Sequence, residues 1–113
     1  MTKYIGNAFS PQMLRNPNCL VAVHEITRKE FELWTHNAIS VVGNQTLANV
    51  LNIEYNRENI VLNYGDTLFV AQVHGGKLPD EVKTLPKGIT FKFYCIKMLE
   101  SLIIKKIDEK GVV

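Results

Sequence analysis

Cysteine is scarce in this sequence, which contains only Cys19 and Cys95. Two isolated cysteines do not make a disulfide framework, and neither has a cysteine or histidine partner at the spacing of a metal site. No metal or other cofactor is therefore expected. Both cysteines are expected to be structural, because neither has a neighbouring base that would activate a thiolate. A reducing cytoplasm is the simplest location for such a chain.

Long hydrophobic runs and an excess of one charge are also missing. No window approaches the roughly 18 apolar residues of a membrane span, and the opening residues 1–7 lack the apolar core of a signal peptide, so no membrane association is expected. Thirteen Lys and Arg residues against eleven Asp and Glu residues give a net charge of +2. This charge is too small for coating nucleic acid by charge alone, so any polyanion must bind at a local site.

Length and composition fit one folded domain. A chain of 113 residues suits a single domain, and 46% hydrophobic with 21% charged residues is an ordinary globular composition. Apolar and β-branched runs predict strands, while capping residues followed by apolar residues at helical spacing predict helices. Strands are expected over residues 4–9, 20–26, 38–42, 56–62, 67–73 and 89–98, and helices over residues 27–34 and 44–52.

Two local patterns support particular elements. Thr27-Arg28-Lys29-Glu30 matches a capping box, in which Thr27 and Glu30 satisfy each other's backbone donors at the start of a helix. The Gly-Asp pair within residues 63–66 is typical of a tight connection. It predicts a hairpin formed by the strands 56–62 and 67–73.

These elements predict an α+β fold with about five strands in one mainly antiparallel or mixed sheet and two short helices. Helices on only one face leave the other face to be buried by a partner or used for binding, so a homodimer is expected. The domain is expected to cover residues 3–98, and residues 99–113 to form a short amphipathic helix or a tail.

The first candidate site is the turn between the expected strand 38–42 and the expected helix 44–52. Backbone N–H groups and the helix dipole at Gly43-Asn44-Gln45-Thr46 favour an anion such as phosphate. The alternative is that Asn44 only caps the helix and that Thr46 is a first-turn residue. No lysine follows the glycine, so a nucleoside triphosphate loop is not indicated.

Two further segments carry groups that can bind phosphate. His74 ends a strand and precedes Gly75-Gly76-Lys77, a turn that can present imidazole and ammonium groups to an anion or can be an ordinary loop. Arg57 can clamp a phosphate or form a surface pair with a nearby glutamate, Glu54 or Glu58. The three histidines are dispersed, so a zinc site is not expected.

Several motifs in a fixed order resemble those of one known family. The segment Asn7–Leu14 is similar to the N-A-F-S-x-x-M-L opening of a small viral and mobile-element family that includes the anti-CRISPR ring nucleases. The ordered set covers residues 3–98, which makes the resemblance one of the whole domain. Further matches are the segments 38–43, 56–57, 66–72, 77–79, 85–88 and 91–94.

The resemblance implies an α+β homodimer whose two subunits enclose a shared cleft. In the ring nucleases that cleft binds cyclic tetra-adenylate, the second messenger of type III CRISPR immunity, and cuts it without a metal. A ribose 2′-hydroxyl attacks the neighbouring phosphate, and a histidine directly after the glycine of the strand-turn-helix is the general acid. The resemblance further implies ligand contacts from Asn7, Ser10, Gly43, Asn44, Gln45, Thr46, Arg57, Gln72 and Lys77.

This sequence departs from the family at the catalytic position, where Asn44 follows the glycine. An amide cannot transfer a proton near neutral pH, and loss of a general acid typically costs about 10²–10⁴ in rate. The acidic stretch that carries the proposed base in the family is replaced by the shorter turn 74–77. The resemblance therefore implies a viral or mobile-element protein that captures a cyclic oligonucleotide in the host cytoplasm with weak or no cleavage.

Two alternatives remain open from the sequence. The first is an active, metal-independent phosphodiesterase in which His74 has replaced the missing catalytic histidine. The second is an accessory factor that binds a host protein and whose cleft is vestigial.

Overall fold

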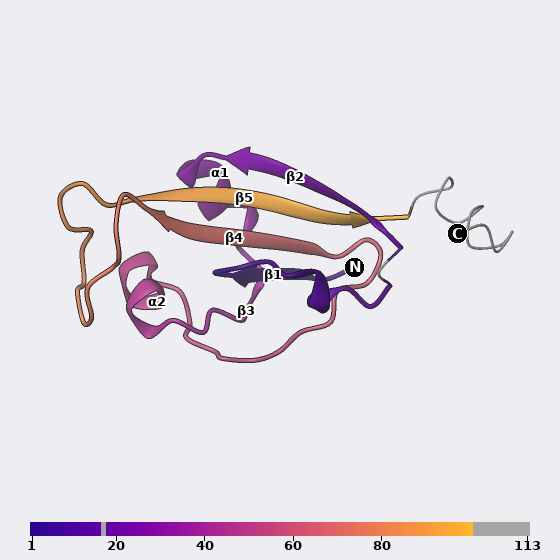
Figure 1. Cartoon of the computed structure of the whole chain (residues 1–113), viewed down its shortest axis with the longest axis horizontal. Helices are drawn as coiled ribbons and strands as arrows, with labels where there is room; N and C mark the ends of the chain where they lie inside the picture. The colour runs from indigo at the N-terminus through magenta and orange to yellow at the C-terminus, as the bar shows by residue number, and fades with distance from the viewer. Residues whose placement is uncertain (17, 101–113) are drawn as a thin grey trace, which may run out of the picture.

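The strands of this protein form one mixed sheet in the order β2-β5-β4-β1-β3, with β4 and β5 side by side along the long axis (Figure 1). The computed structural model describes residues 1–16 and 18–100. The fold class expected from the sequence, one α+β domain with five strands and two helices, is confirmed. The elements are β1 (Lys3–Gly6), a 3₁₀ turn (Pro11–Met13), β2 (Leu20–Ile26), α1 (Arg28–Trp34), β3 (Ile39–Ser40), α2 (Gln45–Leu51), β4 (Thr67–His74) and β5 (Thr90–Leu99).

The sheet is mixed because its two halves pair differently. β5 pairs antiparallel with β2 on one side and with β4 on the other. On the far side of β4, β1 pairs parallel with it, and β3 pairs parallel with β1. The carboxyl ends of β1, β3 and β4 therefore point in the same direction.

Both helices lie against the same face of the sheet, called here the helical face. Its strand residues include Phe69, Ala71 and Phe93, which form one buried cluster with Phe31 of α1 and Leu47 of α2. The Phe31 and Phe93 rings pack with their centroids 4.7 Å apart. This burial explains why a helix of only seven residues is stable here, since tertiary packing rather than helix propensity supplies most of its stability.

The opposite face, called here the loop face, is covered in part by irregular segments of the same chain. Its buried cluster contains Leu68, Val70, Ile96 and Met98 of β4 and β5 together with Leu62. The partly buried side chains that pack on this cluster come mainly from residues 4–21 and from residue 60. The remainder of the loop face, towards the carboxyl end of β4, is polar and carries Gln72, His74, Thr90 and Lys92.

The helix starts follow the local sequence signals. The Thr27 hydroxyl accepts a hydrogen bond from the Glu30 N–H, and the Glu30 carboxylate accepts one from the Thr27 N–H, which confirms the capping box. At α2 the Asn44 carboxamide oxygen accepts a hydrogen bond from the Leu47 N–H at 3.0 Å. Asn52 ends α2 in the left-handed conformation, which asparagine tolerates well.

The predicted hairpin of residues 56–62 and 67–73 is wrong. Residues 56–62 form no strand, and among the described residues their one β-bridge is an isolated parallel bridge from Leu62 to Leu14. β4 pairs instead with β5 along its whole length and with β1 over residues 67–70. The buried Asp66 carboxylate fixes this arrangement, because its two oxygens accept hydrogen bonds from the N–H groups of Thr2 and Asn63, each at 2.9 Å.

Other boundaries differ by a few residues. β1 ends at Gly6 rather than at residue 9, and β3 contains only two residues of the expected 38–42. The predicted start of the tail at residue 99 falls on the last residue of β5, and the rest of that prediction, beyond residue 100, lies outside the described residues. Among the described residues, no helix has the length and hydrophobicity needed to cross a membrane.

Candidate functional site

The parallel strands bring three candidate segments to one edge of the sheet. Asn7 directly follows β1, Gly43 lies three residues beyond β3, and Gln72 and His74 lie in the last part of β4. In open sheets with parallel strands, ligands characteristically bind outside the carboxyl ends of the strands. The sequence could not reveal this meeting, because it depends on pairing between strands that are distant along the chain.

A cavity of about 500 Å³ opens at this edge on the loop face. It is larger than four other cavities among the described residues, which measure about 240 to 350 Å³. Four of the nine residues for which ligand contacts were predicted line it, and they come from three separate chain segments. The lining residues are Gly6, Asn7, Ala8, Ser10, Gln12, Met13, Val41, Gly43, Arg57, Glu58, Asn59, Ile60 and Leu68.

One wall of the cavity is built by Asn7 and Gly43. The Gly43 N–H donates a hydrogen bond of 3.3 Å to the Asn7 carboxamide oxygen. This contact joins the residue after β1 to the turn that precedes α2. Because the oxygen of Asn7 is used in this way, its NH₂ group is the part that can donate to a ligand.

Arg57 crosses Gly43 on the same wall. A Cβ atom placed on Gly43 would lie 3.2 Å from Cγ and 3.6 Å from Cβ of Arg57, so the arginine stem packs directly against the glycine backbone. The absence of a side chain at position 43 is therefore what lets the stem approach so closely.

The alternative that Arg57 forms a surface ion pair does not hold for the described residues. Arg28 and Glu32 form the salt bridge found among residues 1–16 and 18–100, at 3.1 Å, and Arg57 takes part in none there. Glu58, the nearest candidate in the sequence, instead accepts a hydrogen bond from the Asn56 carboxamide. The guanidinium is thus available to an anion, although the Glu58 carboxylate also lies on the cavity wall.

The start of α2 is occupied by contacts within the chain. Asn44 caps the helix, Gln45 donates a hydrogen bond to Asn49, and the Thr46 hydroxyl accepts one from the Glu81 N–H at 3.3 Å. The capping role that the alternative reading of this turn predicted for Asn44 is therefore confirmed. None of the three lines the cavity, and a helix of seven residues provides no anion site by its dipole alone.

Gln72 and His74 lie on the loop face of β4, beyond the cavity. The His74 Nε2 and the Gln72 Oε1 atoms are 3.1 Å apart. An amide oxygen only accepts, so a hydrogen bond at this contact uses the Nε2–H group of His74 as its donor. Lys77 is exposed in the connection from β4 to β5 and makes no hydrogen bond or ion pair with the described residues.

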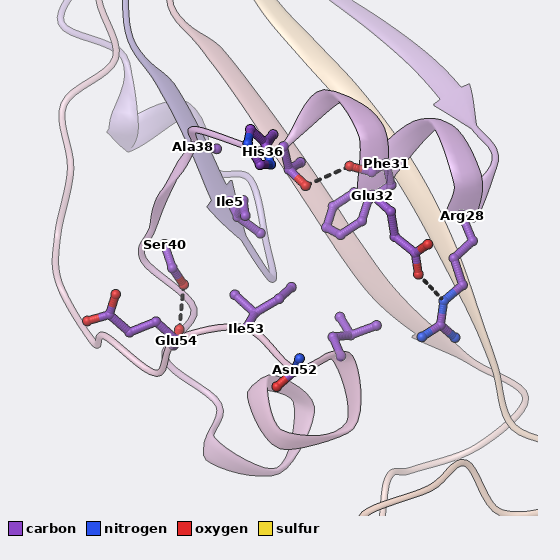
Figure 2. Close-up of a pocket in the computed structure, with 12 residues that line it drawn as sticks. Ile5, Arg28, Phe31, Glu32, His36, Ala38, Ser40, Asn52, Ile53 and Glu54 are labelled. Carbon is purple, nitrogen blue, oxygen red and sulfur yellow. Dashed lines mark hydrogen bonds and ion pairs between the residues drawn. The ribbon is translucent and has the colours of Figure 1, made fainter.

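A second cavity of about 310 Å³ lies on the helical face, between α1 and the segment that follows α2 (Figure 2). Its polar groups serve the fold. Arg28 pairs with Glu32 across one rim, and the Ser40 hydroxyl donates to the Glu54 carbonyl oxygen at the other (Figure 2). No residue with a predicted ligand contact lines this cavity, so the loop-face cavity is the better candidate site.

Metal and thiol chemistry find no support in the described residues. No group of three or more histidine, cysteine or acidic side chains there has the geometry to hold a metal ion. Burial raises the pKa of the Cys95 thiol, while Lys97 and Lys3 lower it by a smaller amount. A thiol with a raised pKa is a poor nucleophile, which agrees with the structural role expected for Cys95.

Some polar residues of this region were not singled out from the sequence. Gln12 and Asn59 line the cavity, and Lys92 lies beside Gln72 on β5. In the sequence, Lys92 alternates with the apolar Phe91 and Phe93, and this alternation is the signal that could have placed it on a polar strand face. Gln12 lies in a 3₁₀ turn of only three residues and Asn59 in an irregular segment, so neither position has a periodic pattern that predicts it.

The comparisons with known proteins give a likeness in structure but none in sequence. No protein-family model matches the chain, and no curated protein matches its sequence. Among solved structures, B116 of Sulfolobus turreted icosahedral virus (STIV) superposes with a TM-score of 0.68 at 19% sequence identity. The match covers 86% of this chain and 99% of that one, so this chain shares the fold of a protein from a Sulfolobus virus over nearly the whole described domain.

Proposed function

We propose that this is a protein of a virus or mobile element that binds a cyclic oligonucleotide, such as cyclic tetra-adenylate, in the cleft of a homodimer. By capturing the molecule, it would withdraw a signal from a host defence pathway, with weak or no cleavage. Two observations support the proposal. One is the resemblance of the ordered motifs to those of the anti-CRISPR ring nucleases, and the other is the structural likeness to B116, a viral protein.

The observation that carries the proposal is the loop-face cavity. The resemblance named Asn7, Ser10, Gly43 and Arg57 as ligand contacts, and these four residues line one cavity although 50 positions separate the first from the last. A volume of about 500 Å³ falls in the range of small-molecule sites, which is roughly 300–1,000 Å³.

The chemistry of the lining suits a phosphodiester. Arg57 supplies a guanidinium with planar donors that match phosphate oxygens, and the Asn7 NH₂ and Ser10 hydroxyl groups add neutral donors. The Glu58 carboxylate on the same wall would repel a ligand that carries several negative charges close together. This balance favours a ligand whose phosphates carry one charge each, such as an oligonucleotide, over a terminal triphosphate.

Weak or absent cleavage follows from the role of Asn44. Its side-chain oxygen accepts the Leu47 N–H, so the amide is engaged in capping α2. An amide that caps a helix neither protonates a leaving 5′-oxygen nor moves towards one without loss of the cap.

One observation keeps a second function open, that of an active phosphodiesterase. The contact with Gln72 holds the His74 ring in a defined orientation on the loop face, as a general acid or base requires. In that case substitution of His74 by alanine abolishes turnover of cyclic tetra-adenylate without abolishing binding.

The homodimer rests on the resemblance, in which two subunits enclose the cleft. Light scattering at micromolar concentration should give about twice the chain mass of 12.8 kDa. A strict monomer under these conditions would remove the shared cleft from the proposal.

The cavity itself is tested by a pair of charge-matched variants. Arg57→Ala should weaken binding of cyclic tetra-adenylate, whereas Arg15→Ala should not, because Arg15 lies at a different cavity. Both arginines are exposed, so neither change should unfold the protein. Equal affinities of the two variants and the unmodified protein, measured by isothermal titration calorimetry, would exclude the cavity as the binding site.

A further inference from the structure

The polar part of the loop face lies beyond the cavity on β4 and β5, past the buried Val70 and the half-buried Tyr94. Gly6 and Leu68 belong to the cavity lining, and Gly6 is paired with Val70 of β4, whose partner on β5 is Tyr94. The next pair along these two strands on the same face is Gln72 with Lys92. Successive side chains on one face of a strand are about 7 Å apart, and neighbouring strands are about 4.8 Å apart.

At these spacings, the distance between Lys92 and the cavity is greater than the size of one phosphate group. Two strand spacings across and one two-residue step along the strand place the Lys92 backbone about 12 Å from that of Gly6. A mononucleotide has a single phosphate group, and at this separation we do not expect that group to contact both the cavity and Lys92. An oligonucleotide that extends from the cavity across β4 and β5 would place a further phosphate group at Lys92.

The charge on Lys92 is free for such a contact. Lys92 is exposed and forms no salt bridge with another described residue. Glu25 of β2 is the acidic neighbour on the same face, and it pairs in register with Tyr94 rather than with Lys92. The two are therefore diagonal neighbours, about 7–8 Å apart at the backbone, and no ion pair between them is formed.

The polar groups around Lys92 complete a small surface. Gln72 lies beside Lys92 and holds the His74 ring through the 3.1 Å contact, while Thr90 lies beside His74. Amide, imidazole, hydroxyl and ammonium groups thus occupy adjacent positions on one face of the sheet. The Gln72 NH₂, Thr90 hydroxyl and Lys92 ammonium groups can donate hydrogen bonds to phosphate or ribose oxygens.

We propose that Lys92 contacts a second phosphate of the ligand, outside the cavity, so that this surface selects nucleotides with two or more phosphodiester links over mononucleotides. The proposal deepens the proposed function and rests on it. Arg57 and Lys92 mark the two ends of the bound segment, one inside the cavity and the other on β5.

Calorimetry with cyclic tetra-adenylate and with AMP tests this assignment. Lys92→Ala should weaken binding of cyclic tetra-adenylate about two- to five-fold, the range for one exposed ion pair, and should leave AMP binding unchanged. The slope of log affinity against log salt concentration should become shallower by about 0.7, the value for one phosphate contact on a single strand.

Lys97→Ala is the matched control, because Lys97 is an exposed lysine of the same strand on the helical face. It removes the same charge and should change neither affinity nor slope. If cyclic tetra-adenylate binds and Lys92→Ala behaves like Lys97→Ala, the assignment of Lys92 is wrong while the proposed function stands. If the unmodified protein binds neither probe, the proposed function fails and this assignment fails with it.

Discussion

A methyl group on Gly43 should weaken ligand binding by displacing Arg57. In Gly43→Ala the new Cβ would lie 3.2 Å from the Arg57 Cγ atom, a few tenths of an ångström inside ordinary van der Waals contact. Gly43 does not have a positive φ angle, so alanine brings no backbone strain there. The exposed arginine stem moves more easily than the backbone, and we expect the free energy of unfolding to change by less than about 0.5 kcal/mol.

The effect on binding should be larger than the effect on stability. One contact from an exposed guanidinium to a phosphate contributes up to about 1 kcal/mol, or about five-fold in affinity. Removal of the whole side chain in Arg57→Ala should give this full loss, and Gly43→Ala should give part of it. Titration calorimetry with cyclic tetra-adenylate measures both.

A double-mutant cycle shows whether the two residues act together. If Gly43→Ala acts by moving Arg57, it should have no further effect in the Arg57→Ala background, because the Cβ of residue 57 alone makes an ordinary contact at 3.6 Å. An equal loss of affinity from Gly43→Ala in both backgrounds would refute this reasoning. It would show that Gly43 affects the ligand without Arg57.

Three further predictions concern the fold. Thr27→Ala removes the oxygen that accepts the Glu30 N–H and should lower the free energy of unfolding by about 1 kcal/mol in a urea titration; an unchanged midpoint would contradict the capping role. Gly75→Ala should lower the free energy of unfolding more than Gly88→Ala does. Both glycines have positive φ angles, but a Cβ on Gly75 would lie 2.1 Å from the Gly88 carbonyl oxygen, whereas a Cβ on Gly88 would meet nothing within 4 Å. Gly88→Ala should lower the free energy of unfolding by about 1 kcal/mol from backbone strain alone. Equal melting temperatures for the two variants would contradict a steric clash at position 75. Because the Cys95 pKa is raised in the folded state, the native chain keeps a proton that the unfolded chain loses, so stability should fall as the pH rises above about 8.5, and Cys95→Ser should reduce that fall.

Local signals in the sequence predicted local structure well. The capping box at Thr27 and Glu30 involves residues three positions apart, and it is formed as expected. The strands β2 and β5 were recognised nearly to their ends, since each is a continuous apolar or alternating run. Both helices were placed within one residue of their observed bounds for the same reason.

The failures concern contacts between distant residues. Residues 63–66 carry turn chemistry, and they do form a turn, but the chain before them does not pair with β4. β1 is the strand that pairs with β4 on this side, and the Thr2 N–H group before it donates a hydrogen bond to Asp66, 64 positions away. No local pattern reports a contact over such a separation.

In the candidate site, too, the local features were predicted from the sequence and the contacts between distant residues were not. The sequence identified Gly43 and Arg57 as separate candidates, each with an ordinary structural alternative. Only the fold shows that the stem of Arg57 lies on Gly43 and that Asn7 hydrogen-bonds to the same glycine. For Asn44 the local alternative was correct, because an N-cap is a property of four consecutive residues.

Cyclic tetra-adenylate incubated with the purified protein, with binding and cleavage measured separately, tests the central claim most directly. The account predicts binding by the unmodified protein with little or no conversion to linear product in the presence of a metal chelator. Asn44→His, which introduces a group able to donate a proton, should increase cleavage of the bound ring. Rapid metal-independent turnover by the unmodified protein that is lost in His74→Ala would contradict the claim of binding without cleavage. Failure of both the unmodified protein and Asn44→His to bind would contradict the account of the site itself.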